Sequence, residues 1–294
     1  MNQNKSNPMV RFVIFIGIFL SILAQVNGQE TTVLNVVYEF KHIRNLANPE
    51  SPYVADMVLS LAKNTSRYTT LYVYNNNKPA AAAQQEQLQS TASSSSATTV
   101  VGGLGLLVNN GGVFLREETL KDLKEQALTQ YTFLGNKTYL LNSKIPKINW
   151  KITKDKKELG DYSCQKAVGD YAGRTYEAWF TTDLPFQNGP WKLGGLPGLI
   201  LEARDLKEEV QFIFKEITRN TDPEETTETF QLYPQLAIPV NAKELRRLEL
   251  SFMKDPIGVL NAVFPDTQVA IMNMEDPSNR SLDKIEEYNP LELD

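Results

Sequence analysis

The chain has 294 residues, of which 41% are hydrophobic and 22% are charged, and its formal net charge is −5 at pH 7. That length allows one large or two small domains, since a domain commonly holds roughly 100–200 residues. The negative charge argues against a nucleic-acid-binding protein, and the densest basic cluster, at residues 151–157, is interrupted by Asp155. Because Cys164 is the one cysteine, an internal disulfide is excluded, and we expect this thiol to be buried as a small apolar side chain.

Residues 1–28 are typical of a secretion signal. Lys5 and Arg11 supply positive charge, an apolar run follows at residues 12–23, and small residues precede the end at Gly28. The apolar run is shorter than the roughly 20 residues that span a bilayer, which favours a cleaved signal. The alternative is an uncleaved N-terminal anchor. We therefore expect cleavage near Gly28, a periplasmic, cell-surface or secreted location, and no transmembrane segment in the mature chain.

The mature chain begins with patterns typical of β-strands. Apolar side chains recur at every second position of residues 33–40, and residues 57–61 and 68–74 are rich in β-forming types. From about residue 75 to 114 the composition changes to alanine, glutamine, serine, threonine and glycine. Such a stretch cannot bury enough apolar surface to offset its ordering entropy, so we interpret it as a low-complexity insertion within the domain.

Two segments show helical patterns. In residues 116–129, two acidic residues stand near the start and several leucines fall near one face. In residues 241–255, three apolar residues share a face, and the following Pro256 would end the helix. We expect a helix in each of these segments.

Six further segments have alternating or β-rich composition and are bounded by turn-forming residues: 131–141, 148–153, 161–168, 174–182, 199–204 and 209–218. Strand spacings of about 8–12 residues favour an antiparallel meander over a parallel sheet. We therefore predict a mainly β, β-rich α+β fold, with one large curved antiparallel sheet or half-barrel and a few helices, which resembles periplasmic lipoprotein carriers. It would form a single domain over residues 29–274, followed by an exposed acidic tail at residues 275–294.

Five short motifs follow one another in the centre of the chain. They are Trp150-Lys151-Ile152, Tyr162-Ser163-Cys164-Gln165-Lys166-Ala167, Gly173-Arg174-Thr175-Tyr176-Glu177-Ala178-Trp179-Phe180, Gly189-Pro190 and Gly194-Gly195-Leu196-Pro197-Gly198-Leu199-Ile200. In this order they resemble the GLPGLI family of cell-envelope proteins from Bacteroidetes-type bacteria. The resemblance implies a secreted envelope protein and leaves its biochemical activity open.

The last of these motifs has rigid turn chemistry. Pro197 fixes its own φ and favours an extended Leu196, and Gly198 is able to take a positive φ. We therefore predict a type II turn that forms a rigid corner between the strand of Trp179 and the strand of Leu199. A structural role at this corner and direct contact with a ligand both remain open.

Aromatic and apolar residues gather around this loop and are candidates for a binding surface. Alternation along the strand directs Trp179 away from the face that carries Tyr176, although Trp179 is equally consistent with a second packed face. Arg174 is a candidate partner for an anionic group, with a surface salt bridge as the alternative. The candidate ligand- or partner-binding residues are Trp150, Arg174, Tyr176, Trp179, Trp191, Leu193, Leu196, Pro197, Gly198 and Leu199.

The sequence lacks the common catalytic and metal-binding motifs. His42 is the single histidine and is expected at the surface, no Gly-x-Ser-x-Gly motif occurs, and nothing in the sequence brings His42 and Cys164 together. One histidine and one cysteine are too few for an ordinary zinc site. We therefore assign no catalytic residue, no metal and no cofactor; the alternative is an acid pair formed by Glu177 and Glu202 on strands beside the loop.

Three functions are compatible with these observations. We favour non-enzymatic binding of an apolar or amphipathic ligand, or of an envelope protein, by the curved sheet. The second is a hydrolase that uses acidic residues in a cleft near the loop, and the third is a structural accessory of an outer-membrane receptor or barrel. None of the three involves nucleic acid.

Overall fold

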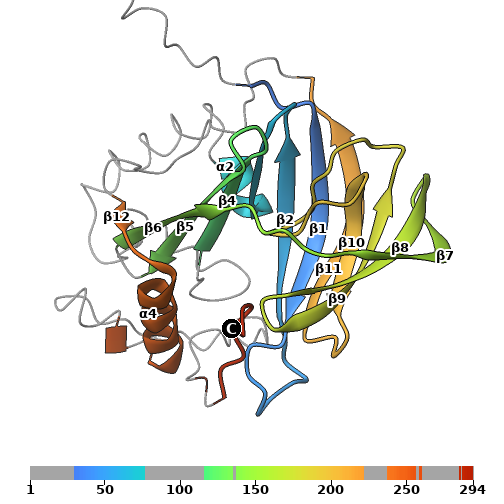
Figure 1. The fold of residues 1–294 in the computed structure, drawn as a ribbon. Coiled ribbons are helices and arrows are strands. Elements are labelled where there is room, and N and C mark those ends of the chain that lie inside the picture. The colour runs from blue at the N-terminus through green and yellow to red at the C-terminus, as the bar shows by residue number, and fades with distance from the viewer. Residues whose placement is uncertain are drawn as a thin grey trace, which may run out of the picture.

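The computed structural model describes residues 30–76, 116–134, 137–221, 237–255, 258–259, 285 and 287–293. Its main feature is one sheet of 12 strands, in the order β12-β6-β5-β4-β3-β2-β1-β11-β10-β9-β8-β7 (Figure 1). The predicted signal, most of the predicted insertion and the start of the predicted tail lie outside the described residues. The division into one domain with an insertion and a tail therefore stays a prediction.

The strands are β1 (Leu34–His42), β2 (Tyr53–Leu61), β3 (Thr65–Thr70), β4 (Arg116–Asp122), β5 (Ala127–Leu134), β6 (Lys137–Lys144), β7 (Lys151–Leu159), β8 (Tyr162–Tyr171), β9 (Arg174–Thr181), β10 (Leu199–Asp205), β11 (Val210–Arg219) and β12 (Ile238–Pro239), and the helices are α2 (Leu71–Asn76) and α4 (Ala242–Lys254). Neighbouring strands pair antiparallel, except that β12 runs parallel to β6. The predicted mainly β fold, with one large curved antiparallel sheet and a few helices, is thereby confirmed (Figure 1).

The first strand lies in the middle of the sheet. β1 pairs along its length with β2 and, on its other side, with β11, from Leu34 opposite Arg219 to His42 opposite Val210. The apolar residues that alternate along β1 are buried, as the sequence predicted. The two halves of the sheet are therefore joined along β1.

The segment between β9 and β10, residues 182–198, packs across one face of the sheet. We call this the inner face and define it as the face that carries Tyr38 and Phe212. Trp191 of the segment stacks on Phe212 with ring centroids 6.3 Å apart, and the Tyr38 hydroxyl donates to the backbone oxygen of Ile200 at 2.7 Å. The loop is thus part of the hydrophobic core and is not a separate surface feature.

Lys121 of β4 holds this loop against the sheet. Its Nζ donates to Asn188 Oδ1 at 2.9 Å, to the Gly189 oxygen at 3.0 Å and to the Leu193 oxygen at 2.7 Å. Burial lowers the pKa of Lys121 to about 7. The three bonds use all three donor positions of the Lys121 ammonium group, so the whole group serves to fix the loop.

The predicted type II turn in this loop is wrong. Gly195, with a φ of 87°, takes the positive φ, and Gly198 does not. Gly198 is required for a different reason, because a Cβ atom there would lie 2.0 Å from the backbone oxygen of Thr181. The loop therefore approaches the end of β9 so closely that only glycine fits.

The predicted helix at residues 116–129 is also wrong, because this stretch forms the hairpin of β4 and β5. Asp122 Oδ1 closes the turn by accepting from the backbone N–H groups of Lys124 and Glu125 at 2.9 Å each. β3 and β6 pair with the outer edges of this hairpin, so pairing within the sheet overrides the helical pattern. The segment predicted as one strand at residues 131–141 is divided between β5 and β6.

The predicted helix at residues 241–255 is confirmed as α4. Asn241 Oδ1 caps it by accepting from the N–H of Glu244 at 2.9 Å, and Leu245 and Phe252 are buried. Figure 1 shows α4 below β5 and β6, with the C-terminus close to it. Within the described residues, no helix combines the length and the apolar character needed to cross a membrane.

Candidate functional site

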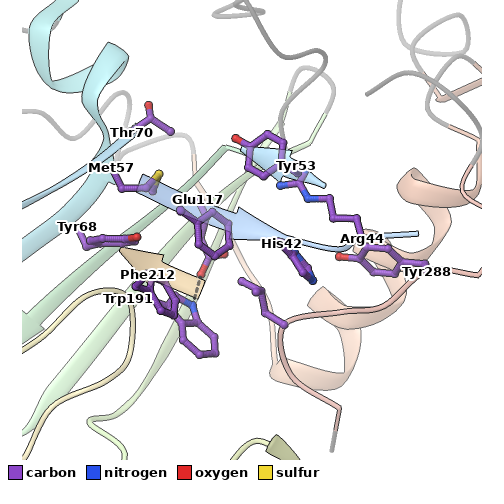
Figure 2. A pocket seen from close by; sticks show the side chains of 12 residues that line it. His42, Arg44, Tyr53, Met57, Tyr68, Thr70, Glu117, Trp191, Phe212 and Tyr288 are labelled. Carbon is purple, nitrogen blue, oxygen red and sulfur yellow. Dashed lines mark hydrogen bonds between the residues drawn. The ribbon is translucent and has the colours of Figure 1, made fainter. Parts of the chain in front are cut away.

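A cavity of about 40 Å³ lies at the inner face, where β1 to β4 and β11 meet the loop after β9 and the C-terminal residues (Figure 2). Its walls are formed by Phe40, His42, Arg44, Tyr53, Met57, Tyr68, Thr70, Glu117, Trp191, Phe212, Tyr288 and Leu291. The walls thus combine aromatic rings with a few polar and charged groups, as ligand-binding sites commonly do.

Aromatic rings form one side of the cavity. Phe212 stacks on Phe40 with ring centroids 5.2 Å apart and on Trp191 at 6.3 Å, and it meets Tyr68 edge-on at 6.4 Å. Offset and edge-to-face pairs of this kind stabilise one another beyond the burial of their area. This side of the cavity is therefore apolar and well packed.

Trp191 connects the aromatic side to a carboxyl group. Its Nε1 donates to Glu117 Oε1 at 3.1 Å. The backbone of Trp191 has a φ of 50°, which is unfavourable for a bulky side chain. Residues in such conformations persist only where the surroundings hold them, and they cluster at functional sites. Lys121 provides this support through its bonds to Gly189 and Leu193 on either side.

Glu117 supplies the carboxyl group of the cavity. Burial raises the pKa of Glu117 above its usual value of 4.5; the charge of Lys192 opposes that rise, and the charge of Glu292 adds to it. A carboxyl group with a raised pKa exchanges protons nearer neutral pH, as proton transfer in catalysis requires.

Glu249 of α4 is a second carboxyl group with this property. Burial raises the pKa of Glu249 to about 8, Glu117 adds to the rise, and Lys192 opposes it. Lys192 Nζ lies 2.7 Å from Glu292 Oε1, which also accepts from the Tyr171 hydroxyl at 3.0 Å. Three carboxyl groups from β4, α4 and the C-terminal residues therefore share the electrostatic field of one lysine.

Neither a metal centre nor a reactive thiol occurs in the part of the chain that the structure describes. No three residues among its histidine, cysteine, aspartate and glutamate side chains are placed together to hold a metal ion. Cys164 is buried, as the sequence predicted, and burial raises the pKa of its thiol to about 11. Among the described residues, Glu117 is the carboxyl group that lines the cavity.

Two polar atoms of the cavity wall, His42 Nε2 and the Tyr68 hydroxyl, have no hydrogen-bond partner among the described residues. His42 is 1% exposed and Tyr68 is 4% exposed. Burial lowers the pKa of His42 well below 6.5, and the charges of Arg44 and Arg174 lower it further, so the imidazole is neutral. The predicted surface position of His42 is wrong, because β1 lies in the centre of the sheet.

The C-terminal residues close one side of the cavity. Tyr288 and Leu291 line it, while Asn289 is 3% exposed and its N–H donates to the Arg44 oxygen at 2.8 Å. The described end of the predicted acidic tail is therefore packed against the sheet, where we expected it to be exposed.

Arg174 anchors these C-terminal residues. Its Nη1 donates to Asp205 Oδ2 at 2.8 Å and to Glu209 Oε2 at 2.7 Å, and its Nη2 donates to Asn289 Oδ1 at 2.6 Å and to the Pro290 oxygen at 2.8 Å. The guanidinium is buried within this network. The alternative of a surface salt bridge is therefore wrong.

The other predicted binding residues lie outside the cavity wall, and Trp191 alone among the ten candidates lines it. Trp150 Nε1 donates to the Gly194 oxygen at 2.9 Å and supports the loop, on which Pro197 is exposed. Trp179 lies on the outer face, which we define as the face opposite Tyr176. The remaining candidates are buried: Tyr176, Leu193, Leu196, Gly198 and Leu199. A binding role for these residues stays a prediction.

The predicted acid pair also lies on the outer face. Glu202 is opposite Trp179 in the register of β10 and β9, and its Oε1 is 2.5 Å from Lys157 Nζ. Glu177 Oε1 is 2.5 Å from Lys166 Nζ. Each carboxylate is thus paired with a lysine, away from the cavity.

The sequence did not point to Glu117, Glu249, His42 or Tyr68 as site residues. A strand assignment for residues 116–122 would have placed Glu117 on the same face as Lys121. Nothing local distinguishes Glu249, because it lies in an ordinary capped helix.

One family has a sequence model that matches this chain: it is described as "N-glycanase peptide, N-terminal domain", and the match covers residues 93–218. The matched domain is that of an N-glycanase. Two crystal structures of PNGF-II, in space groups P21 and C2, are similar to this chain at 14% and 13% sequence identity, and each has a TM-score of 0.47. Both cover 74% of this chain, whereas the chain covers 33% and 32% of theirs, so it spans about a third of their length. No curated protein matches the chain.

The N-glycanase match corrects the family expected from the sequence. It spans all five motifs on which the resemblance to the GLPGLI family rested, so that assignment is wrong. The expectation of a non-enzymatic envelope binder, and with it the preference against an enzyme, is wrong because the matched domain comes from an enzyme. The same match overturns the two alternatives, a hydrolase with an acid pair and an accessory of an outer-membrane receptor.

Proposed function

We propose that this chain acts on N-glycosylated peptides, in a reaction of the N-glycanase type, at the cavity of Figure 2. The observation that carries the proposal is the N-glycanase match over residues 93–218. That segment supplies Glu117, Trp191 and Phe212 to the cavity wall, including its carboxyl group and two of its stacked rings.

The carboxyl groups fit the chemistry of such a reaction. An N-linked glycan is attached to the side-chain nitrogen of an asparagine. Hydrolysis of this amide link requires that water give up a proton as it attacks the carbonyl carbon, and that the nitrogen gain one as the C–N bond breaks. Glu117 is the candidate for these transfers because it lies in the cavity and its pKa is raised. Glu249, with a pKa of about 8, holds a proton at neutral pH and is coupled electrostatically to Glu117.

A second candidate function follows from the length of the chain. The match is to an N-terminal domain, and the chain spans about a third of the similar N-glycanase structures. In this version the chain binds the glycosylated peptide, and another domain or chain completes the hydrolysis.

The predicted secretion signal supports either version. Glycosylated asparagines lie in surface loops of secreted proteins. Cleavage near Gly28 and a periplasmic, cell-surface or secreted location would bring the chain to such substrates.

The proposal is tested with the purified chain from residue 29 onward and a synthetic peptide that carries one N-linked glycan. Binding is measured by calorimetry, and glycan release is measured by mass spectrometry of the peptide. We expect binding and release, and we expect Glu117→Gln to slow release by about 100-fold or more, the usual contribution of a positioned proton-transfer group.

Glu202→Gln is the matched control, because Glu202 is a carboxylate of the outer face paired with Lys157. This variant should release the glycan at the wild-type rate. Binding without release would favour the second candidate, and a chain that neither binds nor cleaves the glycosylated peptide would refute both.

A further inference from the structure

The C-terminal residues 287–293, which we call the strap, close one side of the cavity without forming a strand. Tyr288 and Leu291 of the strap line the cavity. The strap meets the chain after β1 in an isolated β-bridge between Asn45 and Tyr288, and no strand of the described sheet pairs with it. It is therefore able to leave the cavity wall without separating two strands.

Hydrogen bonds from positively charged side chains hold the strap. Arg174 donates from Nη2 to the Pro290 oxygen at 2.8 Å and from Nε to the Leu291 oxygen at 3.1 Å. Arg246 of α4 donates from Nη1 to the Glu292 oxygen at 2.7 Å. Because such bonds respond to nearby charges, the stability of the closed strap depends on the charge around it.

His42 is covered by the strap. Its ring is hydrogen-bonded to the backbone of Asn289, and the side chain is 1% exposed. Its Nε2 has no partner within the described residues. Figure 2 shows His42 and Tyr288 at the same end of the cavity. The strap is thus in direct contact with the single histidine of the chain.

Two arginines are the charged groups that act on His42. Burial holds the pKa of His42 well below 6.5, and the charges of Arg44 on the chain after β1 and of Arg174 on β9 lower it further. The residues opposite His42 on the neighbouring strands are Tyr53 of β2 and Val210 of β11, which carry no charge. A proton on His42 would therefore add a third positive charge to this end of the cavity.

The acidic residues at this end are already engaged. Asp205 Oδ2 and Glu209 Oε2 each accept from Arg174, at 2.8 and 2.7 Å, and Glu209 also accepts from the Asn289 side chain at 3.1 Å. Protonation would turn His42 Nε2 into a donor, which has no partner within the described residues. A buried charge without a partner is strongly unfavourable, so protonation favours a state in which the ring of His42 reaches water.

We propose that the strap closes the cavity at neutral pH and opens in acid, and that protonation of His42 releases it. In the open state water solvates the charged ring, and Tyr288 and Leu291 leave the cavity wall. This closure would act on whatever molecule the cavity binds, so it does not depend on the proposed function.

The direction of the pH effect follows from the two states of His42. In the closed state its pKa is well below 6.5, and in the open state the ring reaches water, so its pKa returns toward 6.5. The open state therefore binds the proton more tightly, and a fall in pH below 6.5 favours opening. At about pH 5.5 an exposed imidazole is about nine-tenths protonated, so the open population should be about tenfold larger than at neutral pH.

Two carboxyl groups act in the opposite direction. Burial raises the pKa of Glu117 and of Glu249, and the charge of Glu292 in the strap adds to both rises, so the closed state holds their protons more tightly. Their contribution remains in a variant that lacks only His42. A comparison of the wild type with such a variant therefore isolates the effect of the histidine.

The test is hydrogen exchange of single amides, followed by NMR from about pH 7.5 to about pH 5.5 and corrected for the intrinsic rate at each pH. The Asn289 and Leu293 N–H groups report on the strap, because they donate to backbone oxygens outside it at 2.8 and 2.9 Å. The Ile200 N–H is the control amide, because it donates to the Asn188 oxygen in the loop after β9 at 3.0 Å. The variant is His42→Gln, whose side chain has a hydrogen-bonding amide but takes up no proton in this range.

We expect acid to increase the opening of the Asn289 and Leu293 amides about tenfold more in the wild type than in His42→Gln. The Ile200 amide should respond equally in both proteins. In the wild type, the ring signals of the single histidine give a second measurement that needs no variant. Protonation of the ring should coincide with the loss of protection at the two strap amides.

A wild-type response of the strap amides equal to or smaller than that of His42→Gln would overturn the proposal. A protonated His42 beneath a strap whose amides stay protected would overturn it as well, even if His42→Gln did not fold. Neither measurement uses the glycosylated peptide, so failure of the proposed function and failure of the acid-opened strap are distinguishable.

Discussion

Two tryptophans on opposite faces of the sheet have very different surroundings. On the inner face, Trp191 is buried, stacks on Phe212 and donates to Glu117. On the outer face, Trp179 is half-buried beside the side chain of Lys157, whose Nζ lies 4.6 Å from the ring centre. The same residue type therefore serves an enclosed cavity on one face and a charged surface on the other.

The carboxyl groups near these tryptophans differ in the same way. Those of the outer face, Glu177 and Glu202, are each paired with a lysine. On the inner face, burial raises the pKa of Glu117 and of Glu249, and the charge of Glu292 adds to both rises. The presence of acidic residues alone is therefore a poor guide to proton transfer. A carboxyl group becomes suited to it when it is buried without a cation paired to it, because its pKa is then raised.

Arg174→Ala should have the largest effect on stability, because Arg174 anchors the C-terminal residues that close the cavity. The buried Asp205 carboxylate would lose its ion pair with Arg174, and Asn289 would lose the hydrogen bond that Arg174 donates to its side chain. Loss of one partner of a buried ion pair costs about 3–5 kcal/mol. We expect chemical denaturation to show a decrease of that size in the free energy of unfolding; a loss below about 1 kcal/mol, typical of an exposed pair, would contradict the buried network.

Gly198→Ala should disturb the loop that carries Trp191. The new methyl group would meet the Thr181 backbone oxygen at 2.0 Å, so the loop has to move, at a cost of about 1–3 kcal/mol or more. The comparison variant is Gly195→Ala, where the Cβ meets no atom within 4 Å but the φ of 87° is unfavourable. Trp191 fluorescence should shift in Gly198→Ala and remain nearly unchanged in Gly195→Ala. The same shift in both variants would argue against the close approach at Gly198.

Glu249→Gln should reduce the pH dependence of stability. The pKa of Glu249 is raised from 4.5 to about 8 in the folded protein, so between these values the folded state holds a proton that the unfolded state releases. The stabilisation is full below about pH 4.5 and is lost as the pH rises through about 8. The wild-type denaturation midpoint should therefore fall from about pH 5 to about pH 8, and Glu249→Gln, which mimics the protonated acid, should show a smaller fall. Identical profiles would disprove the raised pKa.

Lys157→Ala should have the smallest effect, because its pair with Glu202 is partly exposed, with the two side chains 30% and 19% accessible. Exposed pairs of this kind contribute about 0–1 kcal/mol. The free energy of unfolding and any activity on the glycosylated peptide should both stay near the wild-type values. Loss of activity with normal stability would move the functional site to the outer face.

Much of the fold could be predicted because local patterns and tertiary structure agree there. The alternation along β1 and the apolar stripe of α4, with the proline that follows it, both indicated the correct elements. The hairpin of β4 and β5 was missed because its leucines also fit a helical period, and pairing with β3 and β6 decides between the two. Strand pairing of this kind is a long-range effect that a local pattern does not contain.

The candidate site could be predicted only in part. Trp191 was identified because it is one of the aromatic and apolar residues that gather around the loop with rigid turn chemistry. Glu117, Glu249 and Glu292 come from a strand, a helix and the C-terminal residues, and only the complete sheet brings them around Lys192. The raised pKa values of Glu117 and Glu249 depend on that burial, so no short motif could reveal them.

The position of β1 also bears on how the chain is made. β1 is the first strand of the sheet to be synthesised, yet Leu34 pairs with Arg219 of β11, which among the described strands is followed along the chain only by β12. The centre of the sheet therefore cannot be completed until most of the chain exists, and such distant pairings form slowly. Until then the open edge of β1 is exposed to incorrect pairing. The proposed secretion would use the same delay, because a chain that has not yet folded is able to pass through a secretion channel.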